Sequence, residues 1–191
     1  MKIRTVSFLK SSTTPDDFNG AKEIAFVGRS NVGKSSLINY LTNSKIAKSS
    51  KTPGRTRLIN YFSVNNGEVI FVDLPGYGFS LAGKKETASW GNMIEGYLKD
   101  SKNLVNILFL LDIRLKPSAD DIQMMNYMVY YNIPFTIVAT KADKLSRAQA
   151  ERAKREIATA LKVGNDNIFL VSSDKRTGAD ELLSRIDQFL V

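Results

Sequence analysis

The chain has 191 residues, with 27 lysines and arginines against 19 aspartates and glutamates and a formal net charge of +8. It contains neither histidine nor cysteine, which excludes a Ser-His-Asp triad, a cysteine nucleophile, a disulfide and a zinc site built from these residues. Its length and its 43% hydrophobic content predict one globular domain over residues 21–191, preceded by a short flanking extension over residues 1–20. The longest apolar run, residues 104–113, is far shorter than the roughly 20 residues that cross a bilayer. With no signal-peptide core at the start, we expect a cytoplasmic protein that does not associate with membranes.

Apolar runs of strand length alternate with helix-forming segments along the chain. Strands are expected at residues 23–27, 59–64, 68–72, 105–111, 135–139 and 168–171, and helices begin near residues 34, 118 and 146, with one more at the C-terminus. The sequence Asn65-Asn66-Gly67 predicts a hairpin turn, which makes the second and third strands antiparallel. Capping-box spacing at Ser118, Ser146 and Thr177 marks the starts of three helices. The alternation predicts an α/β fold around a mostly parallel sheet.

A phosphate-loop pattern follows the first strand directly. The segment Gly28-Arg29-Ser30-Asn31-Val32-Gly33-Lys34-Ser35 fits G-x-x-x-x-G-K-[ST]. In such a loop, backbone N–H groups converge on phosphate oxygens at a helix N-terminus, where the helix dipole adds to the attraction. Lys34 then spans the β- and γ-phosphates, and Ser35 holds Mg²⁺. The alternative is a tight turn with an exposed lysine, and the octapeptide alone leaves ATP and GTP equally open.

A second motif, Asp73-Leu74-Pro75-Gly76, stands at the end of the hairpin's second strand. Its aspartate is placed to hold a metal-bound water, and its glycine lets a backbone N–H approach the γ-phosphate. Between the two motifs, residues 52–57 form a polar loop whose hydroxyls offer a second metal contact. We favour Thr56 over Thr52 because Thr56 stands nearer the strand that anchors the loop. The alternative is a solvated loop that holds no ligand.

Two further motifs stand at strand ends, Thr140-Lys141-Ala142-Asp143 and Ser172-Ser173-Asp174. The carboxyl ends of parallel strands meet at one edge of an open α/β sheet, where ligands bind. We expect Asp143 to accept hydrogen bonds from N1–H and the 2-amino group of guanine, and to reject adenine, which has no N1–H. Lys141 lays its methylene groups along the base, and an N–H of the Ser172-Ser173 turn meets guanine O6. By itself, Lys-Ala-Asp is a common helix entry.

In this order the motifs resemble those of the TrmE-Era-EngA-EngB-like GTPase superfamily, and most closely those of the EngB (YihA/YsxC) family of ribosome-biogenesis GTP-binding proteins. The resemblance covers nearly the whole chain and is carried by residues 28–36, Lys51-Thr52-Pro53-Gly54-Arg55-Thr56, Asp73-Leu74-Pro75-Gly76-Tyr77-Gly78, residues 140–143 and Ser172-Ser173. It implies a Ras-like P-loop GTPase fold, with a mostly parallel six-stranded sheet, one antiparallel strand and helices on both faces.

The resemblance also implies ligands and partners. Mg²⁺ is expected at Ser35 and Thr56, with Asp73 completing the metal site. GTP or GDP is expected to contact residues 28–35 and 73–76, and also Gly54, Arg55, Thr56, Arg57, Leu58, Thr140, Lys141, Ala142, Asp143, Val171, Ser172 and Ser173. The implied role is cytoplasmic assembly of the large (50S) ribosomal subunit, with rRNA and ribosomal proteins as partners and a link to cell division and septation. We expect a monomer.

The residues expected to carry hydrolysis are Lys34, Thr56, Gly76 and Asn31. In many GTPases a Gln after D-x-x-G orients the attacking water, whereas this chain has Tyr77, so we expect slow intrinsic hydrolysis. Resemblance to cation-dependent relatives makes Asn31 a ligand for K⁺, which would act where an arginine finger acts elsewhere. The alternative is that Asn31 only shapes the phosphate loop.

The excess positive charge is concentrated around these motifs, because residues 24–67 contain no acidic residue. Lys45, Lys48 and Lys51 precede the expected metal threonine and are free to face a polyanion, so we expect a salt-sensitive contact with rRNA phosphates. The alternative is a basic face that only confers solubility. Two other functions stay open: an ATP-using P-loop kinase, against which Asp143 argues, and a basic RNA- or ribosome-binding module whose pocket has little catalytic activity.

Overall fold

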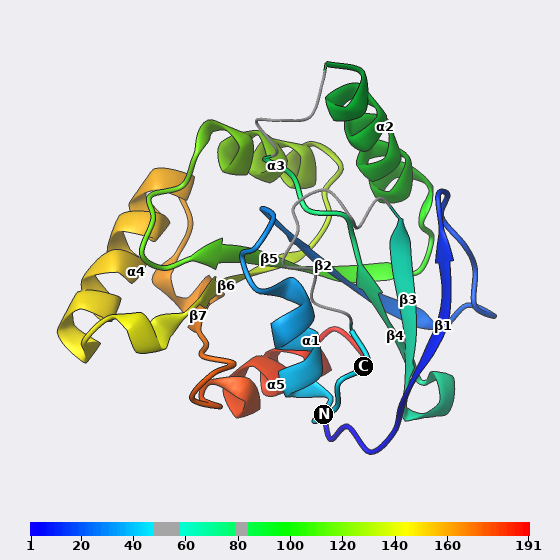
Figure 1. Cartoon of the computed structure of the whole chain (residues 1–191), viewed down its shortest axis with the longest axis horizontal. Helices are drawn as coiled ribbons and strands as arrows, with labels where there is room; N and C mark the ends of the chain where they lie inside the picture. The colour runs from blue at the N-terminus through cyan, green and yellow to red at the C-terminus, as the bar shows by residue number, and fades with distance from the viewer. Residues whose placement is uncertain (48–57, 79–83) are drawn as a thin grey trace.

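The computed structural model describes residues 1–47, 58–78 and 84–191, which form a twisted sheet with helices on both faces (Figure 1). The strands are β1 (Val6–Ser12), β2 (Lys22–Gly28), β3 (Ile59–Val64), β4 (Val69–Asp73), β5 (Leu104–Asp112), β6 (Phe135–Thr140) and β7 (Ile168–Leu170). The helices are α1 (Lys34–Leu41), α2 (Lys84–Asp100), α3 (Ala119–Tyr130), α4 (Arg147–Leu161) and α5 (Ala179–Asp187), with short 3₁₀ turns η1 (Asn65–Gly67), η2 (Ala142–Lys144) and η3 (Asn165–Asn167).

The sheet has the strand order β1-β3-β4-β2-β5-β6-β7. Only β3 runs against the other strands: it pairs antiparallel with β1 and β4, while the remaining pairs are parallel. The expected α/β class and the single antiparallel strand are confirmed. The expected count of six strands is wrong, because the extension over residues 1–20 supplies β1 as a seventh. This strand pairs with the outer side of β3, whose N–H and C=O groups would otherwise form an open edge.

The central strands are buried on both faces, as a sheet covered by helices on each side requires. Alternate residues of β2 point in opposite directions: Ala25 and Val27 pack with residues of α2, α3 and α4, whereas Ile24 and Phe26 pack with residues of α1 and α5. The two helical layers in Figure 1 therefore enclose two apolar cores. In the described ranges, no helix combines the length and apolar character that crossing a bilayer requires.

Two of the three expected capping boxes are confirmed, at Ser118 before α3 and at Ser146 before α4. The third is wrong, because α5 begins one residue later, after Gly178, with no side-chain cap. Thr177 instead exchanges backbone hydrogen bonds with Ser172, at N···O distances of 3.0 and 3.1 Å. Gly178 has φ +83°, and a Cβ there would lie 2.2 Å from the Leu170 carbonyl oxygen, so the chain makes this turn only with glycine.

The parallel strands bring their carboxyl ends to one edge of the sheet. Phe26 of β2 is in register with Asp73 of β4, and Asp112 of β5 is in register with Thr140 of β6. Each of the segments expected to bind nucleotide, apart from residues 54–58, begins at this edge. The fold therefore places them where ligands bind in open α/β sheets.

Candidate nucleotide-binding site

The phosphate loop connects the end of β2 to α1. It turns through two residues with positive φ, Asn31 at 61° and Gly33 at 112°. Gly28 lies against β5, and a Cβ there would stand 2.7 Å from the Leu110 carbonyl oxygen. No side chain caps the start of α1 within the described structure, and its first turn contains no acidic residue. The N–H groups at this helix end are therefore suited to bind an anion.

The segment Asp73–Gly76 lies directly against the phosphate loop. The Ser30 N–H donates to the Tyr77 carbonyl oxygen at 2.9 Å. A Cβ on Gly76 would lie 2.9 Å from the Ser30 nitrogen and 3.1 Å from Lys34 Nζ. The glycine of D-x-x-G is thus required for close packing against the loop, and it places the backbone of residue 76 beside the lysine ammonium.

Asp73 and Lys34 form the charged centre of this region. Burial raises the pKa of Asp73, while the Lys34 charge and a hydrogen bond from Ser35 oppose that rise. Burial likewise lowers the pKa of Lys34, against the attraction of Asp73. Among the described residues, Asp73 Oδ1 is buried and has no hydrogen-bond partner. A buried acceptor without a partner, beside a serine hydroxyl, fits a metal-bound water, because Mg²⁺ prefers oxygen ligands and keeps several waters.

The described ranges contain no group of three or more acidic side chains that could hold a metal by itself. A magnesium ion at Ser35 and Asp73 would therefore need the phosphate oxygens of a nucleotide to complete its coordination, as Mg²⁺ does in sites of this kind. Residues 54–57, including the expected ligand Thr56, lie outside the described residues, so their role stays a prediction. Leu58 is described and precedes β3, with 38% of its surface exposed.

The loop after β6 is tied to the phosphate loop by Thr140. Its hydroxyl is placed to donate to two carbonyl oxygens, that of Val32 at 2.8 Å and that of Leu111 at 3.0 Å. Thr140 is buried, with only 5% of its surface exposed. A threonine in place of the asparagine usual in GTPases thus still connects the two loops, through a hydroxyl with a single proton to share.

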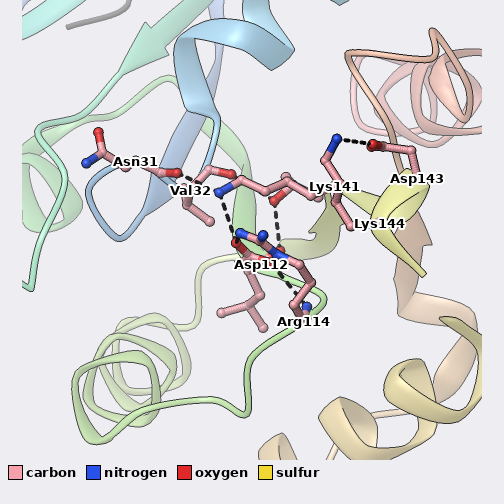
Figure 2. Close-up of polar contacts among 9 residues, drawn as sticks. Asn31, Val32, Asp112, Arg114, Lys141, Asp143 and Lys144 are labelled. Carbon is pink, nitrogen blue, oxygen red and sulfur yellow. Dashed lines mark hydrogen bonds and ion pairs between the residues drawn. The ribbon is translucent and has the colours of Figure 1, made fainter. Parts of the chain in front are cut away.

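Lys141 and Asp143 lie on opposite sides of this loop (Figure 2). Lys141 Nζ donates to the Asn31 carbonyl oxygen at 3.0 Å, so the lysine reaches across to the phosphate loop. Asp143 Oδ1 accepts from Ser172 Oγ at 2.6 Å, and Oδ2 pairs with Lys144 Nζ at 2.8 Å. These two hydrogen bonds lower the pKa of Asp143. Each oxygen of the ionised carboxylate keeps a further lone pair, which a purine N–H group can use.

The turn after β7 completes this group of segments. Ala142 N–H donates to the Val171 carbonyl oxygen at 3.2 Å, and Ser172 Oγ also accepts from the Lys175 N–H at 3.0 Å. Four of the segments predicted to bind nucleotide therefore lie together: residues 28–35, 73–76, 140–143 and 171–173.

Sequence reasoning missed three charged residues at this site, Asp112, Arg114 and Lys144. Lys144 pairs with the carboxylate expected to read the base, as described above. Asp112 ends β5 and binds both Arg114 and Lys141. The sequence did offer a signal for Asp112, because it is a single carboxylate at the carboxyl end of an apolar strand. The interpretation of residues 104–113 as a buried strand gave this aspartate no role.

The class of the protein follows from its match to a family model. A family model described as a 50S ribosome-binding GTPase matches residues 23–141, a range that holds the phosphate loop, Asp73–Gly76 and Lys141. The chain is a GTPase by class.

The probable GTP-binding protein EngB of Desulfosudis oleivorans is 45% identical over 189 residues, 97% of this chain and 95% of that protein. The corresponding protein of Clostridium kluyveri is 46% identical over 194 residues, 100% of this chain and 98% of its own. The chain belongs to the EngB family of GTP-binding proteins.

Solved structures agree with this assignment and with the expected Ras-like fold. The crystal structure of a probable GTP-binding protein EngB matches with a TM-score of 0.75 at 25% identity, covering 88% of this chain and 98% of that one. Era in complex with MgGDPNP and nucleotides 1506–1542 of 16S ribosomal RNA matches with a TM-score of 0.66 at 26% identity, covering 88% of this chain and 56% of that one.

Proposed function

We propose that this chain hydrolyses GTP to GDP with Mg²⁺ and acts as a nucleotide-dependent switch in assembly of the large ribosomal subunit, in the cytoplasm and with a family-level link to cell division and septation. The observation that supports the nucleotide chemistry best is the close approach of Gly76 to Ser30 and Lys34, which brings the two phosphate motifs together. The ribosomal role is supported by the description of the matching family model.

The residues have separate roles in this proposal. Lys34 and the N–H groups of the phosphate loop bind the β- and γ-phosphates, and Gly76 offers its N–H to the γ-phosphate. Ser35 and Thr56 hold Mg²⁺, which neutralises phosphate charge when it is bound with GTP, and Asp73 Oδ1 accepts from a water on the ion. Asp143 selects guanine, with Lys141 along the base and the 171–173 turn at O6.

Slow intrinsic hydrolysis is part of the proposal, because the residue that follows D-x-x-G has a side chain that cannot orient the attacking water. Tyr77 at that position is buried, and its hydroxyl donates to Asp121 Oδ1 on α3 at 2.6 Å. Burial and the neighbouring Asp121 raise the pKa of the Tyr77 hydroxyl, so it remains a neutral donor to that carboxylate. Rapid turnover then depends on a further factor that positions the water or neutralises the developing charge.

Potassium is one candidate for that factor, with Asn31 as its ligand. The residue is exposed, and Figure 2 shows its side-chain amide pointing away from Asp112 while its backbone carbonyl oxygen faces Lys141. A monovalent cation beside the phosphates would stabilise the charge that develops in the transition state.

Turnover should be several-fold higher in KCl than in NaCl at equal ionic strength, measured by phosphate release, and Asn31→Ala should remove the difference. Equal rates of the wild-type protein in the two salts would leave Asn31 with a loop-shaping role only.

The ribosomal role is tested by sedimentation with purified large subunits in GTP, GDP and a non-hydrolysable GTP analogue. The chain should co-sediment with GTP or the analogue and much less with GDP, and binding should weaken as salt rises, because each lysine–phosphate contact releases a counterion. Replacing Lys48 and Lys51 by glutamine should lower the slope of log K against log salt by about two.

The matched control replaces Lys99 and Lys102, two exposed lysines at the amino edge of the sheet, by glutamine. This control should leave the salt dependence unchanged. Binding that ignores both the nucleotide and the salt concentration contradicts the proposed switch, and an absence of phosphate release with and without subunits favours an RNA-binding module instead.

A further inference from the structure

Asp112 is the centre of a charged cluster at the carboxyl end of β5, between the phosphate loop and residues 140–143 after β6, here called the base loop (Figure 2). Its side chain is 8% exposed and accepts from two cations. Arg114 donates Nε to Oδ1 at 2.9 Å and Nη2 to Oδ2 at 2.7 Å, and the Arg114 backbone N–H also reaches Oδ1, at 3.1 Å. Lys141 Nζ lies 2.9 Å from Oδ2. A bidentate arginine fixes the plane of a carboxylate, so Asp112 holds one oxygen toward Lys141.

Lys141 is the link between this cluster and the nucleotide site. Its ammonium contacts Asp112 of β5 and the Asn31 carbonyl oxygen of the phosphate loop, so one side chain joins two separate segments. Its backbone has φ 60° and ψ 33°, a left-handed conformation that non-glycine residues adopt at a cost. Contacts of the side chain help to hold the residue there.

The negative charge of Asp112 is stabilised by the two cations beside it, Arg114 and Lys141. Burial raises the pKa of Asp112, but the hydrogen bonds from Arg114 and Lys141 outweigh that effect and hold the pKa below its usual value. The carboxylate is therefore ionised at neutral pH. The Asn31 carbonyl alone is a weak partner for an ammonium on a flexible four-carbon chain, whereas a fixed, ionised carboxylate gives it a charge-assisted hydrogen bond.

We propose that Asp112 is a positioning residue that fixes the Lys141 side chain across the floor of the base site, and that it thereby sets how long a guanine nucleotide stays bound. Both carboxylate oxygens of Asp112 are engaged by Arg114 and Lys141, so Asp112 acts on the nucleotide through Lys141. Arg114 orients the carboxylate, and Lys141 transmits its position to the base and to the phosphate loop. The inference rests on the proposed nucleotide site.

The test is a double-mutant cycle between Asp112→Asn and Lys141→Met, read out as the dissociation rate of a fluorescent GDP from the full-length chain. Asparagine keeps the shape of the aspartate, and methionine keeps most of the apolar lysine stem. Each single variant should release GDP about tenfold faster, as expected for the loss of a charge-assisted hydrogen bond. The double variant should release GDP no faster than Lys141→Met alone, because Asp112 acts through that lysine.

The control is Asp166→Asn in η3, an exposed residue at the amino end of β7 that undergoes the same change of charge. It should release GDP at the wild-type rate. Thermal unfolding without nucleotide checks that each variant is folded. If Asp112→Asn unfolds at low temperature, Asp112→Glu serves in the cycle, because it keeps the charge but moves the carboxylate relative to Lys141. It should release GDP faster than the wild type, and no faster in combination with Lys141→Met than Lys141→Met alone.

Three outcomes separate the possibilities. A wild-type dissociation rate for Asp112→Asn, or effects of Asp112→Asn and Lys141→Met that multiply in the double variant, overturns the positioning role while leaving the nucleotide site intact. Failure of the wild-type chain to bind GDP would instead overturn the proposed function, and the inference with it. Coupled effects together with wild-type behaviour of Asp166→Asn support the inference.

Discussion

Replacing Lys34 by methionine is expected to weaken binding of GTP and GDP by about a hundredfold, because its ammonium lies beside Gly76, where the two phosphate motifs meet. Two charge-assisted hydrogen bonds to phosphate oxygens account for a loss of that size. Methionine keeps the apolar stem and removes only the charge. Titration calorimetry with GDP in Mg²⁺ measures the change.

Lys45→Met is the matched control for this variant, since Lys45 is exposed and carries the same charge four residues after the end of α1. It should bind GDP like the wild type, which shows that the loss in Lys34→Met does not come from net charge alone. A dissociation constant for Lys34→Met within threefold of the wild-type value would remove Lys34 from the phosphate site.

Asp143→Asn should lower the affinity for GTP by about a hundredfold and raise that for xanthosine triphosphate. An asparagine amide can donate to the oxygen at C2 of xanthine, but it cannot accept from both N1–H and the 2-amino group of guanine as a carboxylate does. Competition of GTP, xanthosine triphosphate and ATP against labelled GDP measures the preference.

Asp166→Asn is the control for this second substitution. Asp166 is exposed in η3, at the amino end of β7 and away from the edge of the sheet where the base is expected to bind. Its nucleotide preference should match that of the wild type. An unchanged preference for GTP in Asp143→Asn would show that another group reads the base.

The parts of the fold that followed from the sequence are those with a strong local pattern. The buried strands β2, β5 and β6 are mostly apolar, and two capping boxes marked the starts of α3 and α4. Two elements were missed. In β1 the five central residues are exposed, so neither face shows the apolar alternation that identifies a strand. In α2 the glycines 91 and 96 weaken the helical signal.

The site was predictable to the extent that its residues belong to motifs with fixed spacing. The phosphate loop, Asp73–Gly76 and the loop after β6 were assigned because each has its own pattern and follows a strand. Asp112 and Arg114 have no such pattern, and their role depends on β5 lying beside β6, which brings Asp112 into register with Thr140. A contact between Asp112 and Lys141, 29 positions apart, is a property of the sheet and not of any local sequence.

Hydrogen–deuterium exchange with and without GDP and Mg²⁺ tests most directly whether one guanine nucleotide contacts both the phosphate loop and the base loop. Peptides that cover residues 28–35 and 140–143 should both become protected, at the same half-saturating GDP concentration, and ADP at that concentration should protect neither. Protection confined to residues 28–35, or equal protection by ADP, would contradict a shared guanine nucleotide site.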